Sequence, residues 1–282
     1  MIDALLNFDF IRYSLISGLL IGFIAPLIGA FIVVRRLSLI ADALSHVTLG
    51  GISFGMFLLT IIPVFSVINP MWFGILFAVI GALLIEKLRT SFSNYQEIAI
   101  PIIMSAGIAL SAIFISLADG FNQEIVGLLF GSISAVNISD LTTIIIITII
   151  VLIFIVLFYK ELFILSFDEE YSKVIGIPKW IQFLFIVIVA MVISASMRVV
   201  GILLVSALIT LPIAISMRIT KGFKQLIALS IILGELSVIL GLIIAFYMNI
   251  SPGGVIVVLL VVMLILTMTI QKLKIKFKKG VV

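Results

Sequence analysis

Residues 34–55 read Val34-Arg-Arg-Leu-Ser-Leu-Ile-Ala-Asp-Ala-Leu-Ser-His-Val-Thr-Leu-Gly-Gly-Ile-Ser-Phe-Gly55, and they combine a long apolar run with ionisable side chains. Most of this stretch is apolar enough for a membrane-spanning helix, yet it holds Asp42 and the only histidine of the protein, His46. Residues four apart share a face of a helix, so the carboxylate and the imidazole are expected to point into the same space. Burying ionisable groups in hydrocarbon is costly, so such residues usually mark a transport or binding path.

Three interpretations of this pair are open from the residues alone. Asp42 and His46 could hydrogen-bond each other and fix helix packing, as polar residues in membranes often do. They could form a proton relay. They could also bind a divalent metal ion, because carboxylate oxygen and imidazole nitrogen suit a borderline metal such as zinc. One chain supplies only two ligands, so a closed metal site would need a dimer.

The composition predicts an all-α, polytopic membrane protein. Of the 282 residues, 64% are hydrophobic and only 11% are charged. This apolar content is far above that of a soluble domain. The apolar runs do not alternate with polar residues, which excludes the strands of an outer-membrane barrel. Cysteine is absent, so disulfides and thiolate metal sites are excluded. We expect a single transmembrane domain over residues 1–282.

The apolar runs predict a helical bundle of about nine spans, or eight to nine if one is incomplete. Most of them reach the length of roughly 20 residues that a bilayer requires. The two runs on either side of Arg198-Val-Val-Gly201 nearly abut, which indicates a re-entrant or broken helix at that point. The predicted spans lie near 11–34, 38–62, 71–88, 98–118, 141–160, 179–197, 199–217, 223–248 and 253–271.

The basic residues predict the topology. With the N-terminus outside and the C-terminus in the cytoplasm, all of them fall on the cytoplasmic side except Arg12 and Arg198. The net charge of +4 therefore reports membrane orientation and predicts no nucleic-acid partner. The residues that set the orientation are Arg35, Arg36, Lys87, Arg89, Lys160, Lys173, Lys179, Arg218, Lys221, Lys224, Lys272, Lys274, Lys276, Lys278 and Lys279.

Two polar islands interrupt the apolar pattern. The outer island, from Asp119 to Asp140, carries acids and no bases. It would be either an ordinary extracellular loop or a vestibule whose negative charge attracts cations. The inner island, residues 166–176, has the pattern of a short helix that Ser166 or Asp168 would cap and Gly176 would end. This helix would lie on the membrane surface or form a docking surface for a cytoplasmic partner.

Other small and acidic residues lie within the apolar runs. Glycine pairs at four-residue spacing predict close helix contacts, and they are Gly18 and Gly22, Gly51 and Gly55, and Gly127 and Gly131. Glu235 is a further intramembrane acid, and its role is open from the sequence.

The chain lacks the phosphate-binding pattern Gly-x-x-x-x-Gly-Lys-Ser/Thr and any long soluble domain. It is therefore predicted not to be an enzyme, and any energy from ATP must come from a separate subunit.

Four segments together resemble the permeases of zinc- and manganese-uptake ABC transporters. The first is Arg35-Arg-Leu-Ser-Leu-Ile-Ala-Asp-Ala-Leu-Ser-His-Val-Thr-Leu-Gly-Gly51, which is similar to the signature of that family. The others follow in the family's order: Leu129-Phe-Gly-Ser-Ile-Ser-Ala-Val136, Val199-Val-Gly-Ile-Leu-Leu-Val-Ser-Ala-Leu-Ile-Thr-Leu-Pro212 and Tyr247-Met-Asn-Ile-Ser-Pro-Gly-Gly254. Asn249 departs from the family pattern, which has an acidic residue at this position.

The resemblance implies a homodimeric permease in the cell membrane. It would receive metal from an extracytoplasmic binding protein and be driven by cytoplasmic ATPase subunits. The family's metal-coordinating pair falls on Asp42 and His46. Its ATPase-contacting segment, a short coupling helix near 166–176, falls on Phe167, Asp168, Glu169, Glu170, Tyr171, Lys173, Ile175 and Gly176.

The expected cargo is a transported divalent ion, and no cofactor is expected to stay bound. Two imidazoles and two carboxylates across a dimer axis fill a tetrahedron, which favours Zn²⁺ over Mn²⁺. The alternative function is an ion-coupled secondary metal transporter in which Asp42 and His46 relay protons.

Overall fold

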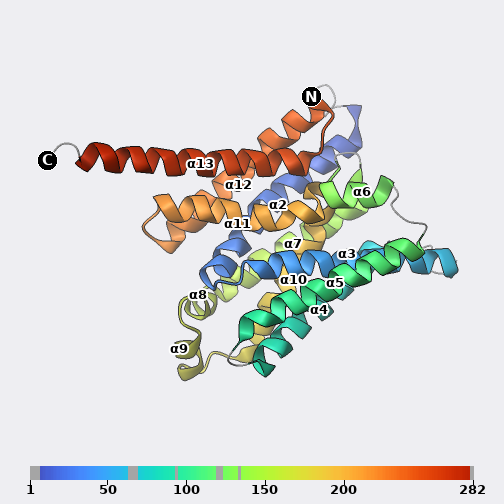
Figure 1. Cartoon of the computed structure of the whole chain (residues 1–282), viewed down its shortest axis with the longest axis horizontal. Coiled ribbons are helices and arrows are strands. Elements are labelled where there is room, and N and C mark those ends of the chain that lie inside the picture. Colours follow the sequence, from blue (N-terminus) through green and yellow to red (C-terminus); the bar gives the residue numbers. More distant parts are fainter. Residues whose placement is uncertain (1–6, 63–68, 93–94, 119–122, 133–134, 280–282) are drawn as a thin grey trace.

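The computed structural model describes residues 7–62, 69–92, 95–118, 123–132 and 135–279, and within these ranges the regular structure is helical, with no strand (Figure 1). The predicted all-α class is confirmed. The elements are α2 (Asp9–Val34), α3 (Leu39–Ile61), α4 (Met71–Ser91), the 3₁₀ turn η2 (Gln96–Ile98), α5 (Ala99–Leu117), α6 (Gln123–Phe130), α7 (Ile138–Leu157), α8 (Tyr159–Phe167), α9 (Glu169–Val174), α10 (Lys179–Val200), α11 (Ile202–Ile219), α12 (Phe223–Met248) and α13 (Pro252–Lys279).

Helix α7 illustrates why these apolar runs are helical. Its sequence is rich in isoleucine and valine, which in water favour strands. In hydrocarbon a lone strand would leave its backbone groups unpaired, whereas a helix pairs them within the segment. The helix begins at a capping box in which the Asn137 side chain accepts the Asp140 N–H at 2.9 Å and the Asp140 carboxylate accepts the Asn137 N–H at 3.1 Å.

Eight of the described helices are long and apolar enough to cross a membrane: α2, α3, α4, α5 with η2, α7, α10, α12 and α13. The seventh predicted span corresponds to α11, whose apolar part, Leu204–Ile219, is shorter. The prediction of eight to nine spans is thereby confirmed. The broken helix expected near Gly201 is present, because α10 ends at Val200 and α11 begins at Ile202.

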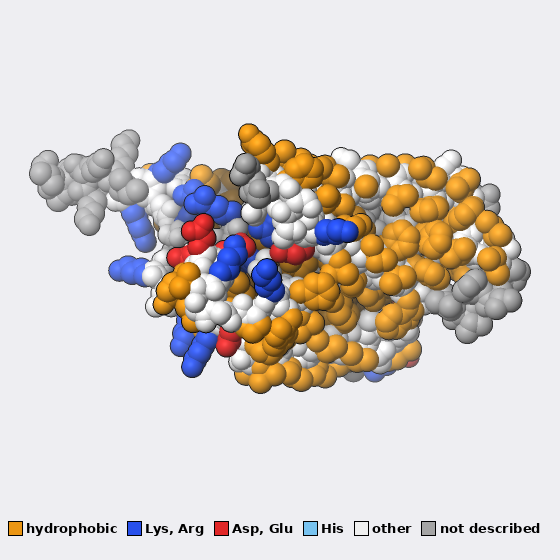
Figure 2. All heavy atoms as spheres, turned by 90° about the horizontal axis from the view of Figure 1, so that it is seen from below, with side chains coloured by type: hydrophobic (Ala, Val, Ile, Leu, Met, Phe, Trp, Pro, Cys, Tyr) orange, Lys and Arg blue, Asp and Glu red, His pale blue; other side chains and the backbone are white. Residues whose placement is uncertain are grey.

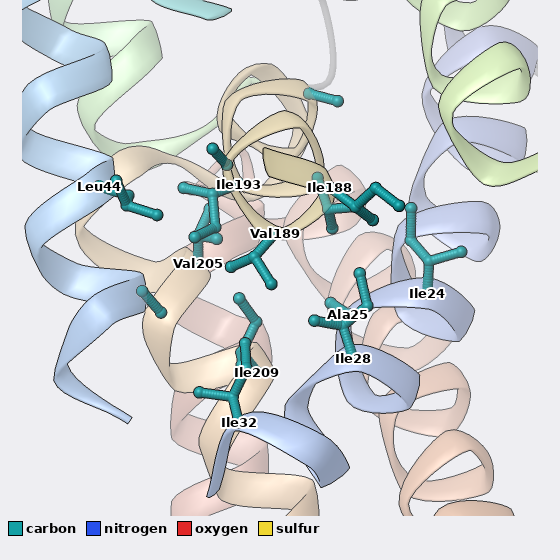
Figure 3. Packing of buried hydrophobic residues seen from close by; sticks show 14 of the residues in the cluster. Ile24, Ala25, Ile28, Ile32, Leu44, Ile188, Val189, Ile193, Val205 and Ile209 are labelled. Atoms are coloured by element: carbon teal, nitrogen blue, oxygen red, sulfur yellow. The ribbon is translucent and has the colours of Figure 1, made fainter. Parts of the chain in front are cut away.

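The buried centre of the bundle lies between α2, α3, α10 and α11. Figure 3 shows Ile24 and Ile28 of α2, Leu44 of α3, Val189 of α10 and Ile209 of α11 converging there. None of these five side chains is more than 2% exposed. This centre fixes the side of α3 that faces inward.

Glycines let neighbouring helices approach closely at two of the three predicted pairs. Gly18 and Gly22 lie against α12, and Gly51 and Gly55 lie against Phe73 of α4. A Cβ at Gly51 would lie 2.5 Å from the Phe73 carbonyl oxygen. The packing role predicted for these two pairs is confirmed.

Charged side chains gather at one end of the molecule. On the face that Figure 2 shows, lysines and arginines are concentrated at the end where α8, α9 and the C-terminal part of α13 lie, and apolar side chains cover most of the rest of that face. The two basic residues that departed from the predicted orientation each have an acidic partner. Arg12 pairs with Asp9, and Arg198 pairs with Asp140 at 3.2 Å.

Candidate functional site

Helix α3 places Asp42 and His46 on one partly open stripe. Residues 40, 41, 43, 44 and 45 are buried, whereas Asp42 and His46 are half-buried and Leu39, one turn earlier, is exposed. Leu44 points into the central core (Figure 3), and it is two residues, or about 200° around the helix, from each of the two polar side chains. Asp42 and His46 therefore face away from the core.

The two side chains have no partner among the residues that the structure describes. Neither the Asp42 carboxylate nor the His46 imidazole makes a hydrogen bond or an ion pair there, with each other or with a neighbour. The interpretation that they lock helix packing by bonding each other finds no support in this geometry. Their lone pairs are left free to bind a ligand from the open side of α3.

The backbone under His46 is held by α5. Ser111 Oγ donates a hydrogen bond toward the His46 carbonyl at 3.1 Å, in addition to a 2.7 Å bond to the Gly107 carbonyl. A Cβ at Gly107 would lie 2.7 Å from the Val47 nitrogen, so only glycine allows α5 this close. Sequence reasoning missed Gly107 and Ser111, although they form a small-residue pair at four-residue spacing, the signal that identified other contacts.

A second hydrogen bond connects α3 to the central core. The hydroxyls of Thr48 and Ser194 lie 3.2 Å apart, and both residues are completely buried. With Ser111 on one side and Ser194 on the other, the turn of α3 that carries His46 has fixed neighbours on both sides. The open stripe therefore presents its ligands from a rigid support, which favours defined coordination geometry.

Within the described residues, one copy of the chain presents two ligand side chains on this stripe, Asp42 and His46. No group of three or more His, Cys, Asp or Glu side chains able to hold a metal occurs among the described residues. The sequence argument that a closed site needs a second copy agrees with this finding.

The segment predicted to contact an ATPase is placed as follows. Phe167 ends α8; Asp168 is the N-cap of α9; Glu169, Glu170, Tyr171 and Lys173 lie within α9; Ile175 is its C-cap; and Gly176 follows with φ of +79°. The Asp168 carboxylate accepts the Tyr171 N–H at 2.8 Å, so Asp168 rather than Ser166 is the cap. The predicted helix over 166–176 is in fact the six-residue α9, because Ser166 and Phe167 belong to α8.

The apolar side chains of this segment are exposed. Phe167, Tyr171 and Ile175 are about half exposed, and Val174 is 82% exposed. The segment lies at the charged end of the molecule, outside the candidate spans (Figures 1 and 2). An apolar face in that position is available for a partner protein or the membrane surface.

At the opposite end, three of the segments that carry the family resemblance meet. A Cβ at Gly201 would lie 2.5 Å from both the Gly131 nitrogen and the Phe130 carbonyl carbon. A Cβ at Gly253 would lie closer still to the Val200 carbonyl oxygen. Gly131 and Gly201 both have positive φ, of +79° and +90°. The role of Gly131 is therefore a backbone turn in this junction, and the prediction that it packs helices as a pair with Gly127 is wrong.

The outer polar island is more structured than a loop. Residues 123–130 form α6, and Asp140 is 1% exposed and paired with Arg198. A neutralised, buried carboxylate does not attract cations, so Asp140 contributes nothing to a vestibule. Asp119 lies outside the described residues.

Two residues whose roles were open are also placed. Asn249 ends α12 with φ of +57°, a left-handed conformation that asparagine tolerates better than most residues. It lines a cavity of about 560 Å³ with residues of α6 and the start of α13. Glu235 is half-buried on α12, which packs against α2, α11 and α13 and not closely against α3.

Comparisons with known proteins bear on what these sites do. A family model described as "ABC 3 transport family" matches residues 7–271. A "Probable metal transport system membrane protein" of Treponema pallidum (strain Nichols) is 31% identical over 269 residues, covering 94% of this chain and 97% of the relative. The "Manganese transport system membrane protein MntC" of Listeria monocytogenes is 30% identical over 257 residues, covering 91% and 89%.

A solved structure described as "PsaBC from Streptococcus pneumoniae in complex with Fab" has the same arrangement of helices. It superposes with a TM-score of 0.81 and 30% identity, covering 94% of this chain and 93% of the other.

Proposed function

This chain belongs to the ABC 3 transport family, and on that premise we propose that it is the homodimeric permease of an importer that carries manganese into the cytoplasm. It is a membrane-embedded subunit of a metal ABC transporter, as its relatives are. We take residues 1–282 as one permease domain, because the family match and the packed helices both run through nearly the whole chain.

The observation that carries the proposal is the unpartnered pair on α3. Asp42 and His46 point out of the bundle from a rigid helix and bind nothing in their own chain within the described residues. A second copy related by a two-fold axis would present the same stripe, because such an interface uses the same patch twice. Two carboxylates and two imidazoles would then surround one ion.

The choice of metal rests on two arguments that differ. The ligand types alone favour zinc, since two imidazoles and two monodentate carboxylates complete a tetrahedron. Some relatives have a cargo metal in their names, and in several of these, including the Listeria monocytogenes protein, the metal is manganese. Bidentate carboxylates and water would give manganese the oxygen-rich shell that it prefers. We give the relatives more weight, because a permease must release its ion and affinity alone does not set selectivity.

Uptake measurements test the proposed cargo. Expression of the chain with its ATPase and binding protein in a strain that lacks manganese and zinc importers is expected to restore manganese accumulation more than zinc accumulation. Metal content would be measured by mass spectrometry of washed cells, with an empty vector and His46→Ala as controls. Restored zinc with unchanged manganese would return the assignment to zinc, and restoration of neither metal would contradict the proposed function.

The alternative of an ion-coupled secondary transporter is not favoured, because the chain belongs to an ABC transport family. In a secondary transporter Asp42 and His46 would relay protons, and uptake would follow the proton gradient instead of ATP.

We also propose that the charged end of the molecule faces the cytoplasm and that the segment 167–176 contacts the ATPase there. The positive-inside rule assigns the end rich in lysine and arginine to the cytoplasm, with the N-terminus outside and the C-terminus inside. The exposed side chains of Phe167, Tyr171 and Ile175 form an apolar face of the kind that a groove on a partner protein recognises. The binding protein would dock at the opposite end.

Placing a charge on this apolar face is expected to release the ATPase. Tyr171→Asp with Ile175→Asp should reduce the amount of ATPase that co-purifies by at least about tenfold, since each substitution desolvates a carboxylate against an apolar groove. Ile250→Asp is the matched control, because Ile250 is 47% exposed at the opposite end. Undiminished co-purification with the double variant would contradict the docking assignment.

A further inference from the structure

A network of charged and amide side chains lies beside α9 and joins four segments. The Arg89 guanidinium, in the last turn of α4, donates to Glu86 at 3.1 Å and to Gln96 of η2 at 3.2 Å. The same group lies 3.9 Å from the Glu169 carboxylate of α9. Gln182 of α10 donates to Glu86 at 2.8 Å. Arg89 is 7% exposed, so its charge depends on these partners.

Arg35 adds a fifth segment, the turn between α2 and α3. Its two terminal nitrogens are buried and have no hydrogen-bond partner among the described residues. Burial lowers the pKa of Arg35, and the charge of Glu169 is the largest influence that opposes this. Arg35, Arg89 and Glu169 line one cavity of about 440 Å³. Glu169 is therefore the acidic residue that lies beside two arginines from different helical segments, paired with Arg89 and sharing a cavity with Arg35.

Helix α9 has two faces with different environments. Glu169 and Ser172, three residues apart, lie on one face, and Ser172 is 2% exposed. Tyr171 and Val174 lie on the other face and are exposed. The inner face contacts the bundle, while the outer face is the one assigned above to the ATPase.

We propose that Glu169 is the positioning residue through which the ATPase-contacting segment acts on the metal site. Its carboxylate pairs with Arg89 of α4, and it lines the same cavity as Arg35, which lies in the turn before α3. The proposal rests on the proposed function above. Arg35 is four residues before Leu39, the first residue of α3, and seven before Asp42. A displacement of α9 therefore shifts the charge balance at the end of the helix that carries both metal ligands.

Removing the charge of Glu169 is expected to separate ATPase binding from the coupling of ATP hydrolysis to metal transport. Without its carboxylate, Arg35 and Arg89 face each other as like charges with less compensation, and α9 loses its ionic contact with the bundle. The outer face of α9 is not altered by this change. ATPase binding is therefore expected to persist while its link to transport weakens.

The test uses the complete transporter, permease with ATPase, in lipid vesicles supplied with metal-loaded binding protein. Glu169→Gln is expected to retain the ATPase and its basal ATP hydrolysis but to lower the metal transported per ATP hydrolysed about tenfold. Glu169→Asp, which keeps the charge on a shorter side chain, is expected to fall between glutamine and the wild type. Glu161→Gln, on the neighbouring helix α8 and outside the segment 167–176, is the matched control and is expected to behave as the wild type.

The outcomes are distinguishable. Unchanged metal transport per ATP in Glu169→Gln would overturn the inference and leave the proposed function intact. Loss of the ATPase from that variant would also overturn the inference, because Glu169 would then be a docking residue, and it too would leave the proposed function intact. A Glu169→Asp variant less coupled than Glu169→Gln would overturn the role of charge, and it remains informative if glutamine reduces the yield of folded protein. Wild-type vesicles that hydrolyse ATP and move no metal would overturn the proposed function, and the inference with it.

Discussion

Alanine at Asp42 or at His46 is expected to abolish metal uptake while the permease still folds and binds its ATPase. Each side chain faces the open stripe of α3 and makes no hydrogen bond or ion pair in the described structure, so its loss breaks no contact that supports the fold. Removing a residue that hydrogen-bonds a metal ligand costs about 10- to 100-fold in metal affinity or activity. Removing a ligand itself is therefore expected to lower metal uptake by at least about 100-fold.

The measurement is accumulation of manganese and zinc in cells in which the amount of permease in the membrane has been verified. Glu235→Gln is the matched control, since Glu235 is also a half-buried acid in a span but lies on α12, away from α3. It is expected to leave uptake unchanged. Wild-type uptake by either alanine variant would refute the metal assignment, and equal loss in all three variants would point to a general sensitivity to intramembrane acids.

Alanine at Gly201 is expected to cause a large loss of stability. Its φ of +90° and ψ of 148° belong to a region that only glycine adopts readily, and its Cβ would meet the backbone of Gly131 and Phe130 at 2.5 Å. Backbone strain and overpacking each cost about 1–3 kcal/mol, which together correspond to a fall in Tm of roughly 5–15 °C.

Thermal unfolding of the purified permease in detergent measures this effect. Gly176→Ala is the control, because Gly176 also has positive φ, +79°, but no atom lies within 4 Å of the position that an added Cβ would occupy. It therefore carries only the conformational cost of about 1–2 kcal/mol. Equal tolerance of alanine at the two positions would show that the close contact at Gly201 contributes nothing.

Much of the fold was accessible from the sequence because membrane helices obey simple rules. Runs of about 20 apolar residues predict the spans, since in lipid a helix pairs its own backbone. The spacing of Asp42 and His46 predicted their shared stripe, because four residues make roughly one turn. Asp168 followed by acids predicted the start of α9, although the true helix is shorter than the island 166–176.

The rest depended on contacts between residues distant in sequence. Nothing near Arg198 shows that it pairs with Asp140, because the two are 58 positions apart. The same holds for Gly131, whose neighbours in the junction come from the end of α10 and the residue that follows it. Ser111 supports His46 from 65 positions away. Local patterns indicate which residues are costly to bury, and only the packed structure shows what compensates them.

The pairing of Asp140 with Arg198 also has a consequence for biosynthesis. A ribosome completes α7 well before α10, so the Asp140 carboxylate has no arginine available when its helix is made. The capping box with Asn137 gives the carboxylate a hydrogen bond from its own segment, and this bond does not require α10. The acid is thus prepared as an acceptor before the base arrives, and the order of synthesis matches the order in which these two charges need partners.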